Sequence, residues 1–416
     1  MEKGDEGKKI NGTTSHNSGN NPFSGSKGKK SVSKSSSREW RRITRRWPLL
    51  FVTFIGPVFS FLLIVWIFSY NTPRELPVAI VDMDHTALSR QITRMTDATA
   101  IASVMRNFGS LTEARKAIES GKVDAVLYIP SDTEKKVYKG HSVNLALYLN
   151  NTNVIKSGLL NSGIRKAIGT LSAGIKLQVQ MKSGKSQSQA ISGIVPVQLN
   201  SNLLFNPYTS YSYYLTVGLM PVLLIVFTLL SCIYTLGDEL YLGTGPKWLR
   251  LAGKNFPVAL AGKLLPYTAI YFCIALLMNI ILFNYLGLPL RGSIISILSG
   301  ELLLIISYQF MAIFLVSLTT NMRLAMSLGS AYCMLALTFS GLTFPAAGMP
   351  AIGQSFSAIF PYTYWIKIFL GQSLRGEPAS SAILPMLAMM LFIVLGILFI
   401  PRLKYMMLNK KRWGKK

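Results

Sequence analysis

The residues best placed for chemistry are two aspartates that directly follow an apolar run. Asp82 and Asp84 close the run Pro77–Val81 in the order Asp-Met-Asp-His-Thr. A carboxylate at a strand end can attack phosphate when a lysine and further carboxylates hold the phosphate and Mg²⁺. The candidates for the further carboxylates are Asp97, Asp124, Asp132 and Glu134. They give no convincing set, so the pair is better interpreted as a strand-end turn whose aspartates cap the next helix.

The remaining chemical signals are weaker. The Asp82 segment resembles the nucleophile motif of haloacid-dehalogenase-type phosphatases, but without the companions that this chemistry needs. Gly184-Lys-Ser ends like a phosphate-binding loop, yet valine stands at 179, where its first glycine belongs. The three cysteines all lie in apolar runs and give neither a disulfide framework nor metal-ligand spacing. The sequence therefore predicts no enzyme activity, no metal site and no cofactor bound by this chain.

Six apolar runs dominate the chain of 416 residues, half of which are hydrophobic. Crossing a hydrocarbon core takes roughly 20 apolar residues in a helix. The runs that reach this length are Pro48–Tyr70, Tyr213–Leu236, Leu264–Leu286, Ile294–Leu318, Leu324–Phe344 and Ile383–Ile400. The expected fold is therefore an α-helical polytopic membrane protein with six transmembrane helices.

The basic residues fix the expected orientation. Lys and Arg gather before the first run, between the second and third, between the fourth and fifth, and after the sixth. Because such flanks face the cytoplasm, both termini are expected inside and residues 71–212 outside. A multi-pass protein of the plasma membrane, here a bacterial inner membrane, is expected. The net charge of +26 then reflects topology and attraction to anionic lipid, with no nucleic acid as partner.

Residues 71–212 combine strand and helix signals. The β-rich runs are 77–82, 123–130 and 143–150, Ser110 to Glu113 form a capping box, and a long helical pattern covers 153–182. An inserted mixed α/β extracytoplasmic domain of about 140 residues can bury its own core.

The two ends of the chain are polar or basic. Residues 1–37 are expected to be a disordered cytoplasmic tail, because Ser, Gly, Lys and Asn predominate. Residues 38–47 place Trp40, Ile43 and Trp47 opposite five arginines. They predict an interfacial amphipathic helix, with positive flanking charge as the simpler alternative. Residues 402–416 form a basic cytoplasmic tail.

A polar interruption at 237–263 separates the second and third runs and predicts a short amphipathic helix. Lys247, Arg250 and Lys254 fall on one side of a helical projection, with Trp248, Leu249 and Ala252 opposite. Two interpretations remain open. The helix lies in the lipid interface with Trp248 anchored at the membrane surface, or its basic face docks a cytoplasmic partner.

Two segments resemble one transporter family. Asp238-Glu239 before Gly243-Thr244, followed by Gly262-Lys-Leu-Leu-Pro-Tyr267, is similar to the cytoplasmic loop of ABC-2 type transporter permeases. Ser340 to Pro345, Gly348-Met-Pro350 and Phe360 to Tyr364 resemble the end of the fifth span and the outer loop of that family. The resemblance covers nearly all of residues 38–401.

The resemblance implies the membrane subunit of an ABC exporter, which moves a substrate out of the cytoplasm or membrane. ATP and Mg²⁺ would be used by separate cytoplasmic ABC ATPase subunits. A second permease copy or a paralogous permease is implied, and a periplasmic adaptor is left open. The ATPase-coupling residues would be Asp238, Glu239, Gly243, Thr244, Lys247, Trp248, Arg250 and Lys254.

The resemblance also locates an outer gate and a re-entrant segment. The gate residues would be Phe344, Pro345, Met349 and Pro350, within an outer re-entrant segment at 345–367. Polar residues inside the spans mark a possible pathway at Glu301, Gln309 and Asn279, with Glu301 at the membrane interface as the alternative.

Two other functions remain open. One is a non-transporting membrane receptor or scaffold that acts through its external domain. The other is an ion-coupled secondary transporter, which the absence of an inverted repeat in the sequence disfavours. Copurification of an ATPase would separate the exporter from both.

Overall fold

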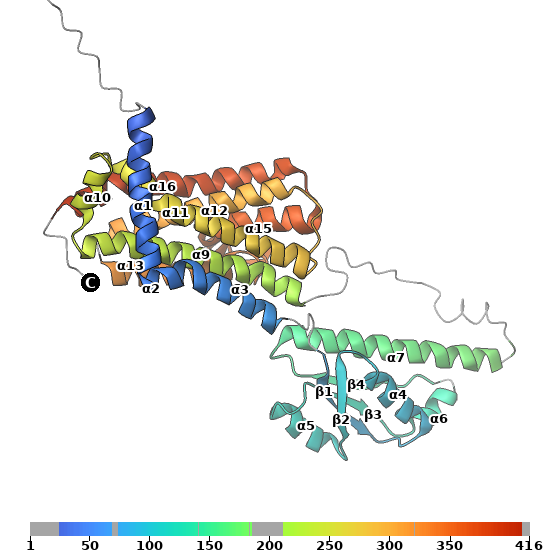
Figure 1. Cartoon of the computed structure of the whole chain (residues 1–416). Helices are drawn as coiled ribbons and strands as arrows, with labels where there is room; N and C mark the ends of the chain where they lie inside the picture. Colours follow the sequence, from blue (N-terminus) through green and yellow to red (C-terminus); the bar gives the residue numbers. More distant parts are fainter. Residues whose placement is uncertain are drawn as a thin grey trace, which may run out of the picture. The chain divides into compact units, whose positions relative to one another are not determined.

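The computed structural model describes residues 25–68, 74–139, 141–182, 184, 211–319 and 321–409 (Figure 1). The chain divides into two compact units, and the second of them is Leu62–Val217. The first, helical unit combines the chain before Leu62 with the chain from Gly218 onward. Each unit is described by itself.

The helical unit contains the first part of the chain and everything after the inserted domain. Its N-terminal elements are α1 (Gly25–Arg45), α2 (Trp47–Leu50), a π-helical turn (Phe51–Ile55) and α3 (Gly56–Ile67), which runs on into the second unit. The later elements are α9 (Tyr211–Tyr241), α10 (Gly245–Leu251), α11 (Phe256–Asn279), α12 (Ile294–Thr319), α13 (Met322–Phe339), α14 (Ala351–Ser357), α15 (Pro361–Leu370) and α16 (Ile383–Leu408). Short π or 3-10 turns lie at Ile280–Tyr285, Ala346–Gly348, Gly371–Arg375 and Ala379–Ala382.

Six helices in the described residues are long and apolar enough to cross a membrane, as the sequence predicts. Their bounds are Trp47–Ile67, Tyr213–Tyr241, Phe256–Tyr285, Ile294–Thr319, Met322–Phe339 and Ala379–Leu408. The fifth ends at Phe339 rather than at the expected Phe344, because Gly341 adopts a positive φ of 88° that a helix cannot continue.

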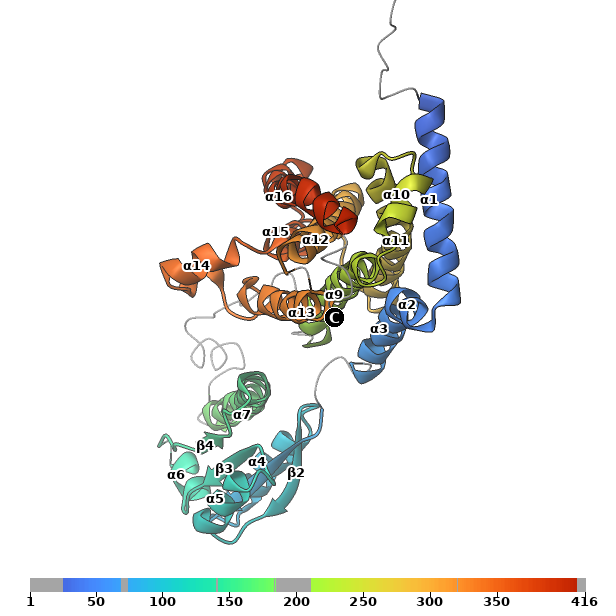
Figure 2. The same ribbon diagram turned by 90° about the vertical axis from the view of Figure 1, so that its left-hand side faces the viewer.

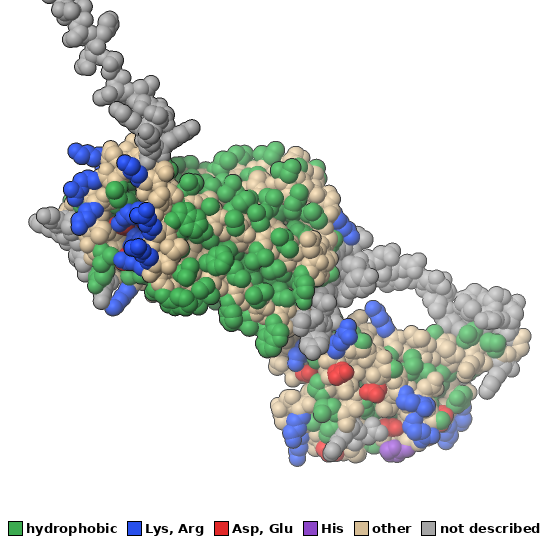
Figure 3. All heavy atoms as spheres, viewed as in Figure 1, with side chains coloured by type: hydrophobic (Ala, Val, Ile, Leu, Met, Phe, Trp, Pro, Cys, Tyr) green, Lys and Arg blue, Asp and Glu red, His purple; other side chains and the backbone are tan. Residues whose placement is uncertain are grey.

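The surface of the helical unit matches a membrane protein. Hydrophobic side chains cover its flank, and Lys and Arg gather at the end that carries α1 and α10 (Figure 3). This chain is therefore a multi-pass membrane protein, and most described basic residues of its helical unit are concentrated at one end of the bundle.

The N-terminal helix corrects the expectation that residues 1–37 are disordered. It begins at Gly25, so residues 25–37 are helical rather than disordered; residues 1–24 lie outside the described part. The helix runs along α11 (Figure 2), where Ser35 contacts the backbone of α11. A Cβ added to Gly262 of α11 would lie 2.8 Å from the carbonyl oxygen of Val32. This close packing overrides the polar composition that suggested disorder.

The inserted domain is built on a four-stranded mixed sheet. The strands are β1 (Leu76–Asp82), β2 (Ala102–Asn107), β3 (Ala125–Ile129) and β4 (Ala146–Leu149), in the order β2-β1-β3-β4. β1 pairs in parallel with β2 and β3, and β4 pairs antiparallel with β3. The sequence predicts β1, β3 and β4 but not β2.

Four helices accompany the sheet of this domain. They are α4 (Ala87–Asp97), α5 (Leu111–Glu119), α6 (Thr133–Tyr138) and α7 (Val154–Lys182). Ser110 caps α5 by accepting a hydrogen bond from the backbone N–H of Glu113 at 3.2 Å, as predicted, but the Glu113 side chain accepts from the N–H of Gly109 rather than of Ser110, so the reciprocal half of the expected capping box is replaced. Figure 1 shows the long helix α7 lying across the sheet. The central strand β1 is almost fully buried, so the domain has a core of its own.

Asp82 and Asp84 hold turns in this domain. Asp82 accepts hydrogen bonds from the N–H groups of Asp84 and His85, at 2.9 and 3.0 Å, and from the Ser89 hydroxyl at 2.6 Å. Burial alone would raise the pKa of Asp82, but these hydrogen bonds outweigh it and lower the pKa. Asp84 accepts from the N–H groups of Thr133 and Glu134 at 2.9 and 3.1 Å. The interpretation as a strand-end turn is confirmed, but the next helix, α4, is capped by Thr86 rather than by either aspartate, and Asp84 instead binds the first N–H groups of α6.

Candidate coupling site

A buried cluster of charges ties α1 to α9 and α11. Lys263 of α11 donates to Glu39 of α1 at 2.7 Å and to Glu239 of α9 at 2.9 Å. All three side chains are fully buried. Helix α1, whose Glu39 is 224 positions from Lys263, therefore meets α9 and α11 at one ammonium group.

Arginines of α1 complete the cluster. Arg38 and Arg42 each donate to Oε1 of Glu239, at 2.8 and 2.7 Å. Arg42 also contacts Asp238, and Arg46 donates to Asp238 at 2.6 Å. The carboxylates Glu39, Asp238 and Glu239 thus face four cations, Lys263 and the three arginines, which leaves one net positive charge.

These contacts change the interpretation of α1. The sequence predicts a helix at 38–47 with its arginines turned toward the inner membrane surface. Arg38 and Arg42 instead point into the protein and bind carboxylates of α9. Because removing one member of a buried pair costs about 3–5 kcal/mol, the cluster holds the register of α1 on the bundle.

Helix α10 is attached to the same body through Trp248. The indole N–H donates to the Ser35 hydroxyl at 3.1 Å, and that hydroxyl donates to the carbonyl of Ala259 at 3.2 Å. The ammonium of Lys263 lies 5.1 Å from the centre of the indole ring, and Phe256 meets that ring edge-on at 5.6 Å. Trp248 is fully buried, so the expectation that it anchors the helix at the membrane surface is wrong.

The predicted coupling residues separate into two groups. Thr244 donates to Glu239, Gly243 adopts a positive φ of 65°, and a Cβ on Gly245 would lie 2.8 Å from the carbonyl oxygen of Met407 in α16. These residues, with Asp238, Glu239 and Trp248, hold α10 in place. The exposed residues are Lys247, Arg250 and Lys254. Lys247 and Arg250 lie on α10 as expected, whereas Lys254 lies beyond its end at Leu251, in a turn with a positive φ of 64°, and is not part of the helical face.

Of the cluster residues, sequence reasoning included only Asp238 and Glu239 in the coupling site; it missed Glu39, Lys263 and the three arginines of α1. Glu39 is the one acidic residue in the basic segment 38–47, and this isolation was the available signal. Lys263 stands in the Gly-Lys-Leu-Leu-Pro-Tyr segment that carried the family resemblance. Neither residue reveals its partner, because Glu39 and Lys263 are separated by 224 positions.

The predicted outer gate lies around a turn between α13 and α14. Phe344, Pro345 and Pro350 are exposed, whereas Met349 is buried. The ring of Phe344 packs on Gly348, where an added Cβ would lie 3.1 Å from it. The structure thus brings Phe344 and the 346–348 turn together.

The expected re-entrant segment 345–367 contains two helices, α14 and α15. The second continues through a π-helical turn to Arg375, further than predicted. Tyr362 donates to the carbonyl of Gly218 in α9 at 3.0 Å, and Trp365 and Phe369 are buried. Figures 1 and 2 show α15 alongside α12 and α16. The helix is a half-length element inside the bundle.

The three pathway candidates lie between α11 and α12. Asn279 donates to Glu301 at 2.7 Å, and Gln309 accepts from Thr268 at 2.9 Å. Glu301 is fully buried, and its second carboxylate oxygen has no hydrogen-bond partner among the described residues. Asn279 and Glu301 form one hydrogen-bonded pair. Gln309 forms another with Thr268, and it lies eight residues after Glu301 in α12.

Comparison with known proteins gives one family. The family model described as ABC-2 family transporter protein matches residues 47–400. No curated protein matches the chain. The matched range contains all six candidate spans in whole or in large part, together with the inserted domain and α10.

Proposed function

We propose that this chain, which belongs to the ABC-2 family of transporter proteins, is driven through α10 by separate ATPase subunits and works as an exporter. Membership of this family makes the chain the membrane subunit of a transporter. Its partner ATPases, the outward direction of transport and the role of α10 are the proposed parts.

The observation that carries the proposal is the division of α10 into two faces. Lys247 and Arg250 of α10 are exposed, as is Lys254 just beyond the end of the helix, whereas Trp248 is buried against α1 and α11. A force applied to the exposed face therefore reaches two other helices through a packed side chain rather than through a flexible loop.

The charge cluster extends this connection to α9. Because Lys263 binds both Glu39 and Glu239, the cytoplasmic ends of α1, α9 and α11 are held as one body. Closure of the ATPase subunits would push on α10, move this body and tilt the spans that continue from it. An opening toward the outer side, near Phe344 and Met349, would release the substrate.

The assembly proposed here contains two permease chains, either two copies or this chain with a paralogue, above two ATPases. The termini and α10 lie on the cytoplasmic side of the plasma membrane, and the inserted domain lies outside. Figure 3 supports this orientation, because the basic residues gather at the α10 end. An adaptor that binds the inserted domain is compatible with it.

The test of this function is copurification of the ATPase with charge-reversed α10. Arg250→Glu should lose the ATPase or its coupled hydrolysis, because it turns an exposed cation of the docking face into an anion. Arg323→Glu makes the same change at an exposed residue of α13 and serves as the control. If Arg250→Glu folds normally and retains a fully active ATPase, α10 is not the docking element. If no ATPase copurifies with the native chain, a receptor or an ion-coupled transporter becomes the better interpretation.

A further inference from the structure

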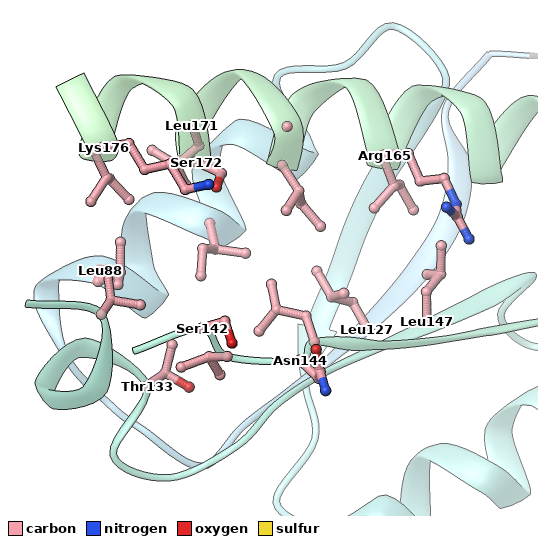
Figure 4. A pocket seen from close by; sticks show the side chains of 18 of the residues that line it. Leu88, Leu127, Thr133, Ser142, Asn144, Leu147, Arg165, Leu171, Ser172 and Lys176 are labelled. Carbon is pink, nitrogen blue, oxygen red and sulfur yellow. The ribbon is translucent and has the colours of Figure 1, made fainter. Parts of the chain in front are cut away.

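The inserted domain contains a large cleft that the transport proposal does not use. Its volume is about 1200 Å³, and it lies between α7 and the β3–β4 side of the sheet (Figure 4). Pockets of about 300–1000 Å³ already enclose a drug-sized ligand. The cleft is formed within the one compact unit Leu62–Val217.

One wall of the cleft is an apolar stripe on α7. Ile164, Ile168, Leu171, Ile175 and Val179 recur every three or four residues and line it. Between the first and last of them the helix rises about 22 Å, at 1.5 Å per residue. Ile164 and Leu171 are buried in the domain core, so the half-buried part of the stripe is Ile168, Ile175 and Val179. This part is one side chain wide, a shape that suits a single extended hydrocarbon chain.

The opposite wall is also apolar. Leu88 and Ile92 of α4, Leu127 of β3 and Leu147 of β4 line it, and Figure 4 shows Leu88, Leu127 and Leu147 across from α7. Leu127 is fully buried, so this wall continues into the domain core. A hydrocarbon chain in the cleft would contact the same kind of surface that the core itself buries.

The charged groups at the cleft all have one sign. Arg165 and Lys176 line it from α7, and the described residues that line it include no Asp or Glu. Figure 4 shows the two cations toward opposite ends of the cleft. A ligand with an anionic group therefore meets attraction and no carboxylate repulsion inside the cleft.

Of the two cations, Arg165 has the side chain that the structure orients for binding an anion. Its Nε donates to the Asn161 side chain at 2.8 Å, which orients the guanidinium group. The terminal nitrogens make no hydrogen bond or ion pair with another described residue, and in Figure 4 they point away from α7 toward Leu147. An oriented guanidinium at the end of an apolar channel matches a carboxylate head group.

We propose that this cleft binds a single-chain anionic amphiphile, a long-chain fatty acid or a molecule of that chemistry. The acyl chain lies along the α7 stripe and the carboxylate pairs with Arg165. This site is independent of α10 and of the ATPase, so binding is measurable on the membrane subunit alone.

The chain offers a matched pair of glycines for the test. Gly169 lines the cleft, and a Cβ added there would meet nothing within 4 Å. A Cβ added to Gly174 on the same helix would also meet nothing within 4 Å, but Gly174 does not line the cleft. Gly169→Phe should place a phenyl group at the edge of the cleft without a clash at its Cβ, and Gly174→Phe controls for the effect of a phenyl group on α7.

The experiment is photo-crosslinking of the purified full chain with a sixteen-carbon fatty acid that carries a photoreactive group. Labelling is mapped to peptides by mass spectrometry. We expect label on α7 and on the β3–β4 segment, retained in Gly174→Phe and lost in Gly169→Phe. Arg165→Glu and the methyl ester of the probe should each reduce labelling, by up to about fivefold, the upper factor expected of one exposed ion pair.

Three results would overturn the proposal. Label confined to the apolar helices of the membrane unit would mean that the probe only partitions into the detergent micelle around them. Equal labelling of Gly169→Phe and the native chain would exclude the cleft. Loss of self-association in Gly169→Phe, without any labelling of the native domain, would assign the cleft to a second copy of this chain.

Discussion

Lys263→Met removes the ammonium group at the centre of the charge cluster and should destabilise the helical unit. Glu239 would keep Arg38 and Arg42 at 2.8 and 2.7 Å, but Glu39 would keep them only at 3.5 and 3.6 Å. The variant therefore weakens mainly the ion pairing of Glu39, a fully buried carboxylate. Since an orphaned buried charge costs about 3–5 kcal/mol, we expect a loss near the lower end, about 3 kcal/mol.

The assay is the free energy of unfolding of the purified chain in mixed micelles under increasing denaturing detergent. Lys156→Met is the matched control, because the Lys156–Asp124 pair at 3.5 Å is partly exposed and should contribute at most about 1 kcal/mol. Adding Glu39→Gln to Lys263→Met removes the orphaned charge. The double variant should then be more stable than the sum of the single losses predicts, by about 1–3 kcal/mol. A loss within about 0.5 kcal/mol for Lys263→Met, or strict additivity, would refute the buried cluster.

Further predictions concern α10, the inserted domain and the topology. Trp248→Ala should cost about 3–5 kcal/mol in the same unfolding assay, and Trp248→Phe clearly less, because the ring-sized volume is kept; equal losses would show that packing is not the cause. The lowered pKa of Asp82 means that its stabilisation is complete above its unfolded pKa of about 4 and is lost as pH falls through the lower folded pKa. Asp82→Asn should therefore weaken the fall in the stability of the domain as pH drops below about 4, without abolishing any chemical step, and phosphate-ester hydrolysis lost in this variant would contradict a purely structural Asp82. In a chain without its native cysteines, Ser131→Cys should react with an impermeant maleimide in intact cells and Lys254→Cys only after lysis; the reverse pattern would invert the topology.

The architecture was predictable from the sequence because long apolar runs have few alternatives. All six candidate spans overlap the runs read from the sequence. The inserted domain was predictable in outline, since β1, β3, α5 and α7 carry strong local patterns. β2 was missed because Ala102–Asn107 has neither a clear alternation nor strong turn residues at both ends.

The candidate site was only partly predictable, because its key contacts join distant segments. The basic face of α10 follows from a projection of seven or eight residues, and the structure exposes it. The inward orientation of Arg38 and Arg42 does not follow, since the same arginines would suit a membrane surface equally well. Only the position of α9 beside α1 shows that Asp238 and Glu239 bind them.

The start of α1 was unpredictable for a similar reason. Residues 25–37 lack large apolar side chains, so local composition favours disorder. Their helical form depends on small contacts with another helix, where Ser35 and Gly262 allow the two backbones to approach closely. Tertiary packing of this kind has no local signature.

The most direct test of the proposed coupling is a pair of distances measured through the ATP cycle. In a chain without its native cysteines, spin labels are placed on Arg41→Cys and Lys247→Cys, which are exposed on α1 and α10. If α1 and α10 move as one body, the distance between these labels stays the same in the nucleotide-free and ATP-trapped complex. The distance between Lys247→Cys labels on two permease copies changes between the two states. A change within the α1–α10 pair, with the distance between the copies constant, would contradict transmission through Trp248 and the charge cluster.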